Sequence, residues 1–141
     1  MGHVGHPLVG LRFSLKRLLY WLPAFFWAGL IFYFSSQSSP PGAVHVPDSV
    51  GHYFAYLILA LCCALGFAGR IPIQQAPSVY LSSWVAATLY GVSDEWHQMF
   101  TPARTPTWED VLVDALGALC GVALLAVIGV VWRRRQQEHE S

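Results

Sequence analysis

Charged residues are scarce in this sequence, and neither sign is in excess. Aspartate, glutamate, lysine and arginine make up 11% of the 141 residues, whereas hydrophobic residues make up 55%. This composition is too apolar for an ordinary soluble domain, in which about a quarter of the residues are charged. It indicates an integral membrane protein with one domain, 1–141. Because the formal net charge is zero, nothing in the composition indicates a nucleic-acid partner.

Cysteine is also scarce, and the spacings typical of metal sites are missing. The three cysteines, at 62, 63 and 120, lie inside apolar runs. An odd number of buried thiols favours free side chains over a disulfide framework. Without a compact HxxxH or CxxC spacing, we predict neither a metal ion nor another cofactor. The residues whose donor atoms would nevertheless suit a metal are His52, Asp94, His97 and Asp114.

Long apolar runs divide the chain into segments that we predict to be transmembrane helices. Leu18 to Phe34 contains 17 residues without a charge, and it is too long and aromatic for the apolar core of a signal peptide. Pro23 lies near its start, where a helix tolerates proline. The predicted spans are 18–36, 48–69, 78–98 and 108–132.

The third span depends on polar residues for its length. Val79 to Val92 offers only 14 mainly apolar residues, and a helix needs about 20 to cross the hydrocarbon core. Either the helix carries Ser93 to Gln98 into the membrane, or the segment is short or re-entrant. We predict the first arrangement.

Several residues indicate where the helices begin and end. Asp48 is expected to cap the second helix, which should stop at Gly69 and Pro72. Thr107 with Asp110 three residues later resembles a capping box at the start of the fourth helix.

The distribution of basic residues predicts the orientation. With four spans both termini lie on one side, and seven of the eight basic residues fall there, Arg104 being the exception. Because cytoplasmic loops are rich in lysine and arginine, the tails 1–17 and 133–141 should be cytoplasmic. The predicted fold is therefore an all-α bundle of four transmembrane helices with both termini in the cytoplasm.

Polar side chains on three of these helices should meet below the external surface. Asp48, His52 and Tyr56 share one face at i, i+4 and i+8. Asp94 and Asp114 each lie about 6 Å from the outer end of their helices, at 1.5 Å per residue. Ionisable groups in a bilayer turn toward the bundle interior, so we expect one shared pocket. Small residues four apart on the fourth helix, Gly117 and Gly121, would let a neighbouring helix approach closely.

The polar residues and their order resemble the VanZ-like family of small bacterial membrane proteins. The resemblance covers most of the chain and rests on three motifs: IFYFSSQS (31–38), DSVGHYFAYLIL (48–59) and SDEWHQMFTPARTPTWEDVLVDALGALCG (93–121). Two residues depart from the family pattern. Asp114 stands where asparagine is common, and Ser49 where lysine is common. Both changes make the pocket more anionic, which argues against an anionic ligand.

The resemblance implies a multi-pass protein of the bacterial cytoplasmic membrane with a role in the cell envelope. The family takes its name from resistance to the glycopeptide antibiotic teicoplanin. The positions matching the family pattern are Asp48, His52, Tyr56, Asp94, Glu95, Gln98, Pro102, Arg104, Asp110, Gly117 and Gly121. The expected partners are membrane lipids and either a cell-wall precursor or a glycopeptide. The oligomeric state is left open.

Two functions compete for these residues. In an enzyme acting on an envelope precursor, Asp94 or Glu95 would be the base and His52 the proton carrier. The substrate-binding residues would then be Asp48, Tyr56, Gln98, Arg104, Asp110 and Asp114. In a non-enzymatic binding module or small transporter subunit, the same side chains would only hold a ligand. Two simpler interpretations remain: the acids join the helices by hydrogen bonds, and Arg104 neutralises them instead of gripping a substrate anion.

Overall fold

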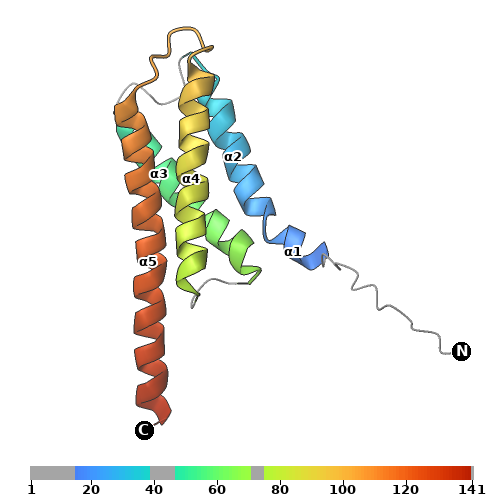
Figure 1. The fold of residues 1–141 in the computed structure, drawn as a ribbon, viewed down its shortest axis with the longest axis vertical. Helices are drawn as coiled ribbons and strands as arrows, with labels where there is room; N and C mark the ends of the chain where they lie inside the picture. The colour runs from blue at the N-terminus through green and yellow to red at the C-terminus, as the bar shows by residue number, and fades with distance from the viewer. Residues whose placement is uncertain (1–14, 39–46, 71–74, 141) are drawn as a thin grey trace, which may run out of the picture.

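The computed structural model describes residues 15–38, 47–70 and 75–140, and this part of the chain is helical without a strand. The helices are α1 (Leu15–Leu19), α2 (Leu22–Ser35), α3 (Asp48–Ala68), α4 (Pro77–Gln98) and α5 (Trp108–Glu140) (Figure 1). The predicted segments 48–69, 78–98 and 108–132 fall on α3, α4 and α5. Most of the predicted N-terminal tail, most of the loop after α2, and Pro72 lie outside the described residues.

The predicted helix 18–36 is divided into two, and this corrects the sequence prediction. α1 ends at Leu19, and α2 begins at Leu22 with Pro23 in its first turn. Proline has no N–H to donate, and its ring would clash with the carbonyl group four residues earlier, at Leu19. The chain therefore turns at Tyr20 and Trp21. The indole of Trp21 covers Gly66 of α3, where a Cβ would lie only 2.6 Å from the ring.

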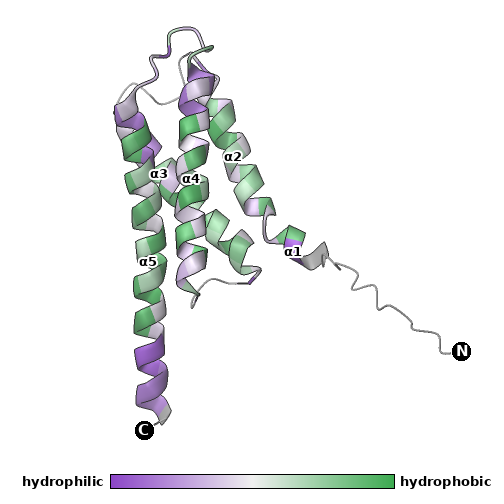
Figure 2. Cartoon of the chain, in the orientation of Figure 1, coloured by the Kyte–Doolittle hydropathy of each residue, from purple (hydrophilic) through white to green (hydrophobic). Residues whose placement is uncertain are grey.

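Among the residues that the structure describes, three stretches are long and apolar enough to cross a membrane, namely Arg17–Ser35, Asp48–Ala68 and Trp108–His139. α4 has 22 residues but is less apolar, because its last turns carry Asp94 and Glu95. Figure 2 shows hydrophilic residues at the end of the bundle where α4 ends and α5 begins. Large apolar side chains point outward, and Phe25, Leu89 and Leu112 are more than half exposed. An outer surface of this kind is typical of helices that face lipid.

Helix α3 packs against α2, α4 and α5, and its contact with α5 is the closest in the bundle. A Cβ on Gly117 would overlap the carbonyl oxygen of Tyr53, and one on Gly121 would lie 2.6 Å from that of Leu57. The expected close approach at these glycines is therefore confirmed. It brings the first turns of α3 and α5 together, and these turns carry most of the predicted polar layer.

The predicted helix ends are confirmed in part. Gly69 has φ 61° and ends α3 in the left-handed conformation that glycine adopts readily. Asp48 does not cap α3, which corrects that prediction. Pro47 occupies the cap position and makes no side-chain bond to the helix. The Asp48 carboxylate is free of the helix because it pairs with Arg104.

Candidate functional site

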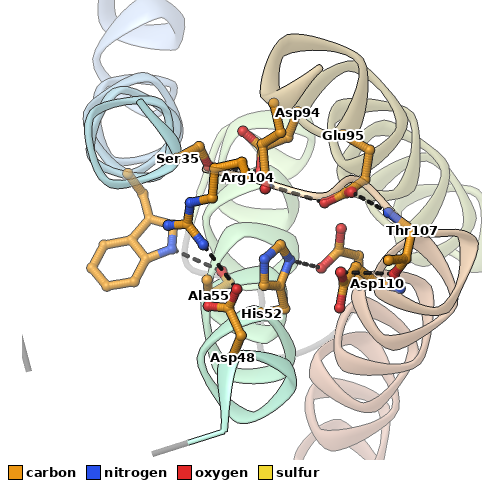
Figure 3. A network of polar contacts seen from close by, with 12 residues as sticks. Ser35, Asp48, His52, Ala55, Asp94, Glu95, Arg104, Thr107 and Asp110 are labelled. Carbon is orange, nitrogen blue, oxygen red and sulfur yellow. Dashed lines mark hydrogen bonds and ion pairs between the residues drawn. The ribbon is translucent and has the colours of Figure 1, made fainter. Parts of the chain in front are cut away.

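A cluster of polar side chains lies where the last turn of α4 meets the first turns of α3 and α5 (Figure 3). The polar end of α2 and the loop between α4 and α5 border the cluster. Asp94, Glu95 and Asp114 are at most 6% exposed. The acidic side chains in the last turns of α4 therefore face other helices and not lipid.

His52 and Asp114 form the interhelical contact at the centre of the cluster. His52 Nδ1 lies 3.0 Å from Asp114 Oδ1. The Asp114 side chain is fully buried, whereas that of His52 is 11% exposed. Gly91 of α4 makes room for this carboxylate, because a Cβ there would lie 2.7 Å from Asp114 Oδ2. The residue that departs from the family pattern thus stands between α3 and α4.

Gln98 joins the two neighbouring carboxylates of α4. Its side-chain amide donates to Asp94 Oδ2 at 3.2 Å and to Glu95 Oε1 at 3.1 Å. The hydroxyl of Ser35, at the end of α2, donates to the same Asp94 oxygen at 2.8 Å. Ser35 had no predicted role, although its place in a polar run directly after an apolar helix could have suggested one.

Glu95 is also tied to the start of α5. The backbone N–H of Thr107 donates to Glu95 Oε2 at 3.0 Å. The Thr107 hydroxyl accepts from the backbone N–H of Asp110 at 3.1 Å and donates to the Asp110 carboxylate at 2.8 Å. Thr107 therefore caps α5 as predicted. In a capping box the N–H of the cap residue bonds the side chain three residues later, but here Glu95 of α4 accepts that bond.

Arg104 lies at the rim and does not neutralise the buried acids. Its guanidinium pairs with Asp48 at 2.8 Å. The remaining bonds run to the end of α2, from Nε to the carbonyl oxygen of Gln37 at 3.1 Å and from Nη2 to that of Phe34 at 3.3 Å. Arg104 thus fastens the α4–α5 loop to α2 and to the start of α3.

His97 points away from the cluster, although it lies in the same motif. Its Nε2 is 3.0 Å from the hydroxyl of Ser36. Its ring stacks on Phe32 with centroids 4.4 Å apart. The metal set of His52, Asp94, His97 and Asp114 considered from the sequence is therefore not assembled, because His97 faces α2.

Three buried oxygen atoms in or beside the cluster have no hydrogen-bond partner among the described residues. They are Tyr56 Oη, Asp94 Oδ1 and Asp114 Oδ2. Tyr56 is 0% exposed. Buried polar groups are nearly always satisfied by protein or by ordered water. Unpartnered oxygens on three neighbouring helices therefore leave hydrogen-bonding capacity for a further polar group.

Two open grooves flank the end of α4, and Trp96 lines both. One has a volume of about 340 Å³ and reaches Asp94. The other, about 410 Å³, reaches Glu95 and Thr107. Their other lining residues are mostly apolar or aromatic, including Phe32 and Trp108. Each groove thus connects an apolar outer surface with a buried carboxylate.

The fold and this cluster together define a small all-helical membrane protein with acidic residues buried at one end. A family model described as VanZ/LLP1 matches residues 20–129. The match covers more than half of the chain, so the protein belongs to this family, as the resemblance predicted. No curated protein and no solved structure matches the chain.

Proposed function

We propose that this protein crosses the bacterial cytoplasmic membrane four times, with both termini in the cytoplasm. α4 has 22 residues, and at 1.5 Å per residue it is about 33 Å long, close to the roughly 30 Å of a hydrocarbon core. Arg17 lies in α1, Arg70 follows the end of α3, and Arg133 lies late in α5, all away from the helix ends that carry the polar cluster. With positive charge retained inside, the cluster faces the exterior.

The external cluster binds the polar part of an envelope precursor or a glycopeptide. Hydroxyl or amino groups of this ligand donate hydrogen bonds to the cluster. The observation that carries this proposal is the set of unpartnered oxygens of Tyr56, Asp94 and Asp114. A buried group left unsatisfied costs about 1–3 kcal/mol, and a ligand with several donors would recover that free energy. Anionic groups of the ligand, such as the phosphates of a polyprenyl-linked precursor, would stay outside the cluster, because Arg104 is already engaged by Asp48.

The grooves support a lipid-linked ligand. An acyl or polyprenyl chain would lie along the apolar lining beside Trp96 while the head group reaches Asp94 or Glu95. Ligand sites are commonly apolar clefts with a few polar groups that fix orientation. A ligand without an apolar chain would leave the apolar lining of both grooves uncovered.

His52 gives the site a means of moving protons. Its contact with Asp114 and its closeness to Glu95 suit acid–base chemistry on a bound hydroxyl or amino group. Asp94 or Glu95 would take the proton, and His52 would carry it. In the alternative, a binding module or small transporter subunit, the same contacts hold the ligand without changing it.

The test is to incubate the purified protein in lipid nanodiscs with isolated lipid-linked envelope precursor, and separately with teicoplanin. Ligand retained on the protein and recovered unchanged supports binding, whereas a product of altered mass supports an enzyme. Glu95→Gln should lose both. Glu109→Gln removes an exposed carboxylate of the same chemistry and should lose neither. A chain that retains no ligand contradicts the proposal.

Resistance is tested separately in cells. Expression in a susceptible bacterium should raise the inhibitory concentration of teicoplanin, and Glu95→Gln should abolish the increase while Glu109→Gln preserves it. If neither the native protein nor the control variant changes susceptibility, the resistance role is wrong even where ligand binding holds.

A further inference from the structure

The buried acids at the end of α4 lack positive charge. Asp94, Glu95 and Asp114 are 3%, 6% and 0% exposed. Carboxylates removed from water are costly unless they are paired. Within residues 15–38, 47–70 and 75–140, no lysine or arginine forms an ion pair with them, and the basic group that reaches them is His52. The cluster therefore needs further positive charge, supplied either by protons on the carboxylates or by a bound cation.

Three of its side chains are arranged as ligands of one ion. His52, Glu95 and Asp114 each offer one ligand atom, and these atoms all lie within 4.8 Å of one another. Oxygen and nitrogen ligands lie about 2.0–2.2 Å from Zn²⁺, so the ligands of one ion are roughly 3–4 Å apart. His52 Nδ1 and Asp114 Oδ1 already meet this requirement at 3.0 Å. The three ligand atoms lie within 4.8 Å of one another, so they must draw together by about 1 Å to bind one ion.

Tyr56 supplies an independent indication that something occupies this space. It is 0% exposed, and its hydroxyl has no hydrogen-bond partner. The hydroxyl is within electrostatic range of the carboxylates of Asp94, Asp114 and Glu95. A fully buried O–H near three carboxylates, without an acceptor of its own, leaves a hydrogen bond for a further group to make. A water molecule on a bound ion would accept this bond.

We propose that His52, Glu95 and Asp114 bind one divalent transition-metal ion, with Zn²⁺ or Mn²⁺ as the fitting chemistry. One imidazole with two carboxylates suits these ions better than a purely oxygen-liganded ion such as Mg²⁺. Two positive charges would offset the two carboxylate ligands. His52 and Asp114 were among the residues whose donor atoms suit a metal. Glu95 was not, because the three residues lie on α3, α4 and α5 and have no common spacing. This site shares Glu95, Asp114 and Tyr56 with the ligand proposed above, and with the ion bound His52 and Glu95 act as metal ligands instead of proton carrier and base. The metal assay uses no other ligand, so the two proposals fail separately.

The test measures metal content without any other ligand. Full-length protein purified in detergent is stripped with EDTA, incubated with Zn²⁺ or Mn²⁺ alone, passed through a desalting column and analysed by inductively coupled plasma mass spectrometry. We expect Glu95→Gln and His52→Asn to retain one ion per chain fewer than the native protein. Changes in residues that merely orient ligands weaken metal binding about 10–100-fold, so loss of a ligand should raise Kd by at least that factor.

Two variants serve as matched controls, because each removes the same chemical group outside the site. Glu109→Gln removes an exposed carboxylate of α5, and His97→Gln removes the imidazole that contacts Ser36. Both should retain the ion. Metal bound by histidines of the terminal tails is the same in every variant, so it cancels when the metal contents of two variants are subtracted. Equal metal content in the native protein and Glu95→Gln would overturn the proposal, as would loss of the ion in either control.

Discussion

Replacing Gly121 by alanine should loosen the contact that holds the polar cluster together. The new Cβ would lie 2.6 Å from the carbonyl oxygen of Leu57, whereas ordinary van der Waals contact begins at 3.4 Å. The obstacle is backbone in the middle of α3, which cannot rotate away as a flexible side chain does. Helices α3 and α5 must therefore separate locally by about 0.8 Å, the difference between these two distances.

The expected cost follows from two opposing terms. Overpacking a close contact typically costs about 1–3 kcal/mol, and replacing glycine by alanine inside a helix recovers about 0.5–1 kcal/mol. Gly121→Ala should thus lower the free energy of unfolding by about 1–2 kcal/mol. Gly29→Ala is the matched control, because nothing lies within 4 Å of a Cβ there. It should leave stability unchanged or raise it.

Thermal unfolding in detergent, followed by tryptophan fluorescence, distinguishes the two variants. A fall of 1–2 kcal/mol corresponds to several degrees in Tm for a chain of this size. Gly117→Ala should be worse still, because its Cβ would overlap the Tyr53 carbonyl oxygen more closely. If Gly121→Ala melts at or above the temperature of Gly29→Ala, the close packing of α3 on α5 is wrong.

Two further predictions concern charge. Asp94→Asn keeps an oxygen that can accept the bond from Ser35, and Glu95→Gln keeps one that can accept the bond from Thr107. Each variant should therefore leave Tm unchanged or raise it. This is the result expected where acids serve a function at a cost in stability. A large fall would mean that these acids hold the helices together. Arg104→Lys cannot reproduce the three bonds of the guanidinium and should lower the free energy of unfolding by about 1–2 kcal/mol, at about 1 kcal/mol for each lost bond. An unchanged denaturation midpoint would show that this loop is not fastened by Arg104.

Features set by neighbouring residues could be predicted from the sequence. Gly69 ends α3 and Thr107 caps α5, because both roles depend on conformation and bonding within a few residues. The polar layer also followed from spacing, since Asp48, His52 and Tyr56 are i, i+4 and i+8 on one helix. Length and hydropathy gave the helix positions in the same way.

Contacts between helices could not be predicted from residue spacing. Spacing places His52 and Asp114 at similar depths, but only the rotation of each helix decides whether their side chains meet at 3.0 Å. Helix rotation also decides that a Glu95 oxygen lies within 4.8 Å of ligand atoms of His52 and Asp114, whereas His97 faces α2. A helix tolerates proline only in its first turn. Pro23 lies beyond the first turn of a helix that starts at residue 18, so the helix is divided and α2 begins at Leu22.

The composition of α4 constrains how the protein enters a membrane. This helix is not apolar enough to count with the other candidate spans, and two of its buried residues are acids. On insertion scales one aspartate costs about 2.5–3.5 kcal/mol at the centre of a helix, which is an upper bound for Asp94 and Glu95 in the last turns of α4. Asp94 finds its partners on α2 and within its own last turn, and Glu95 finds one at the start of α5. In the four-span arrangement proposed above, the translocon would hold α4 until α5 emerges from the ribosome and release the two as a pair. Truncation after Gln98 should then leave α4 outside the bilayer.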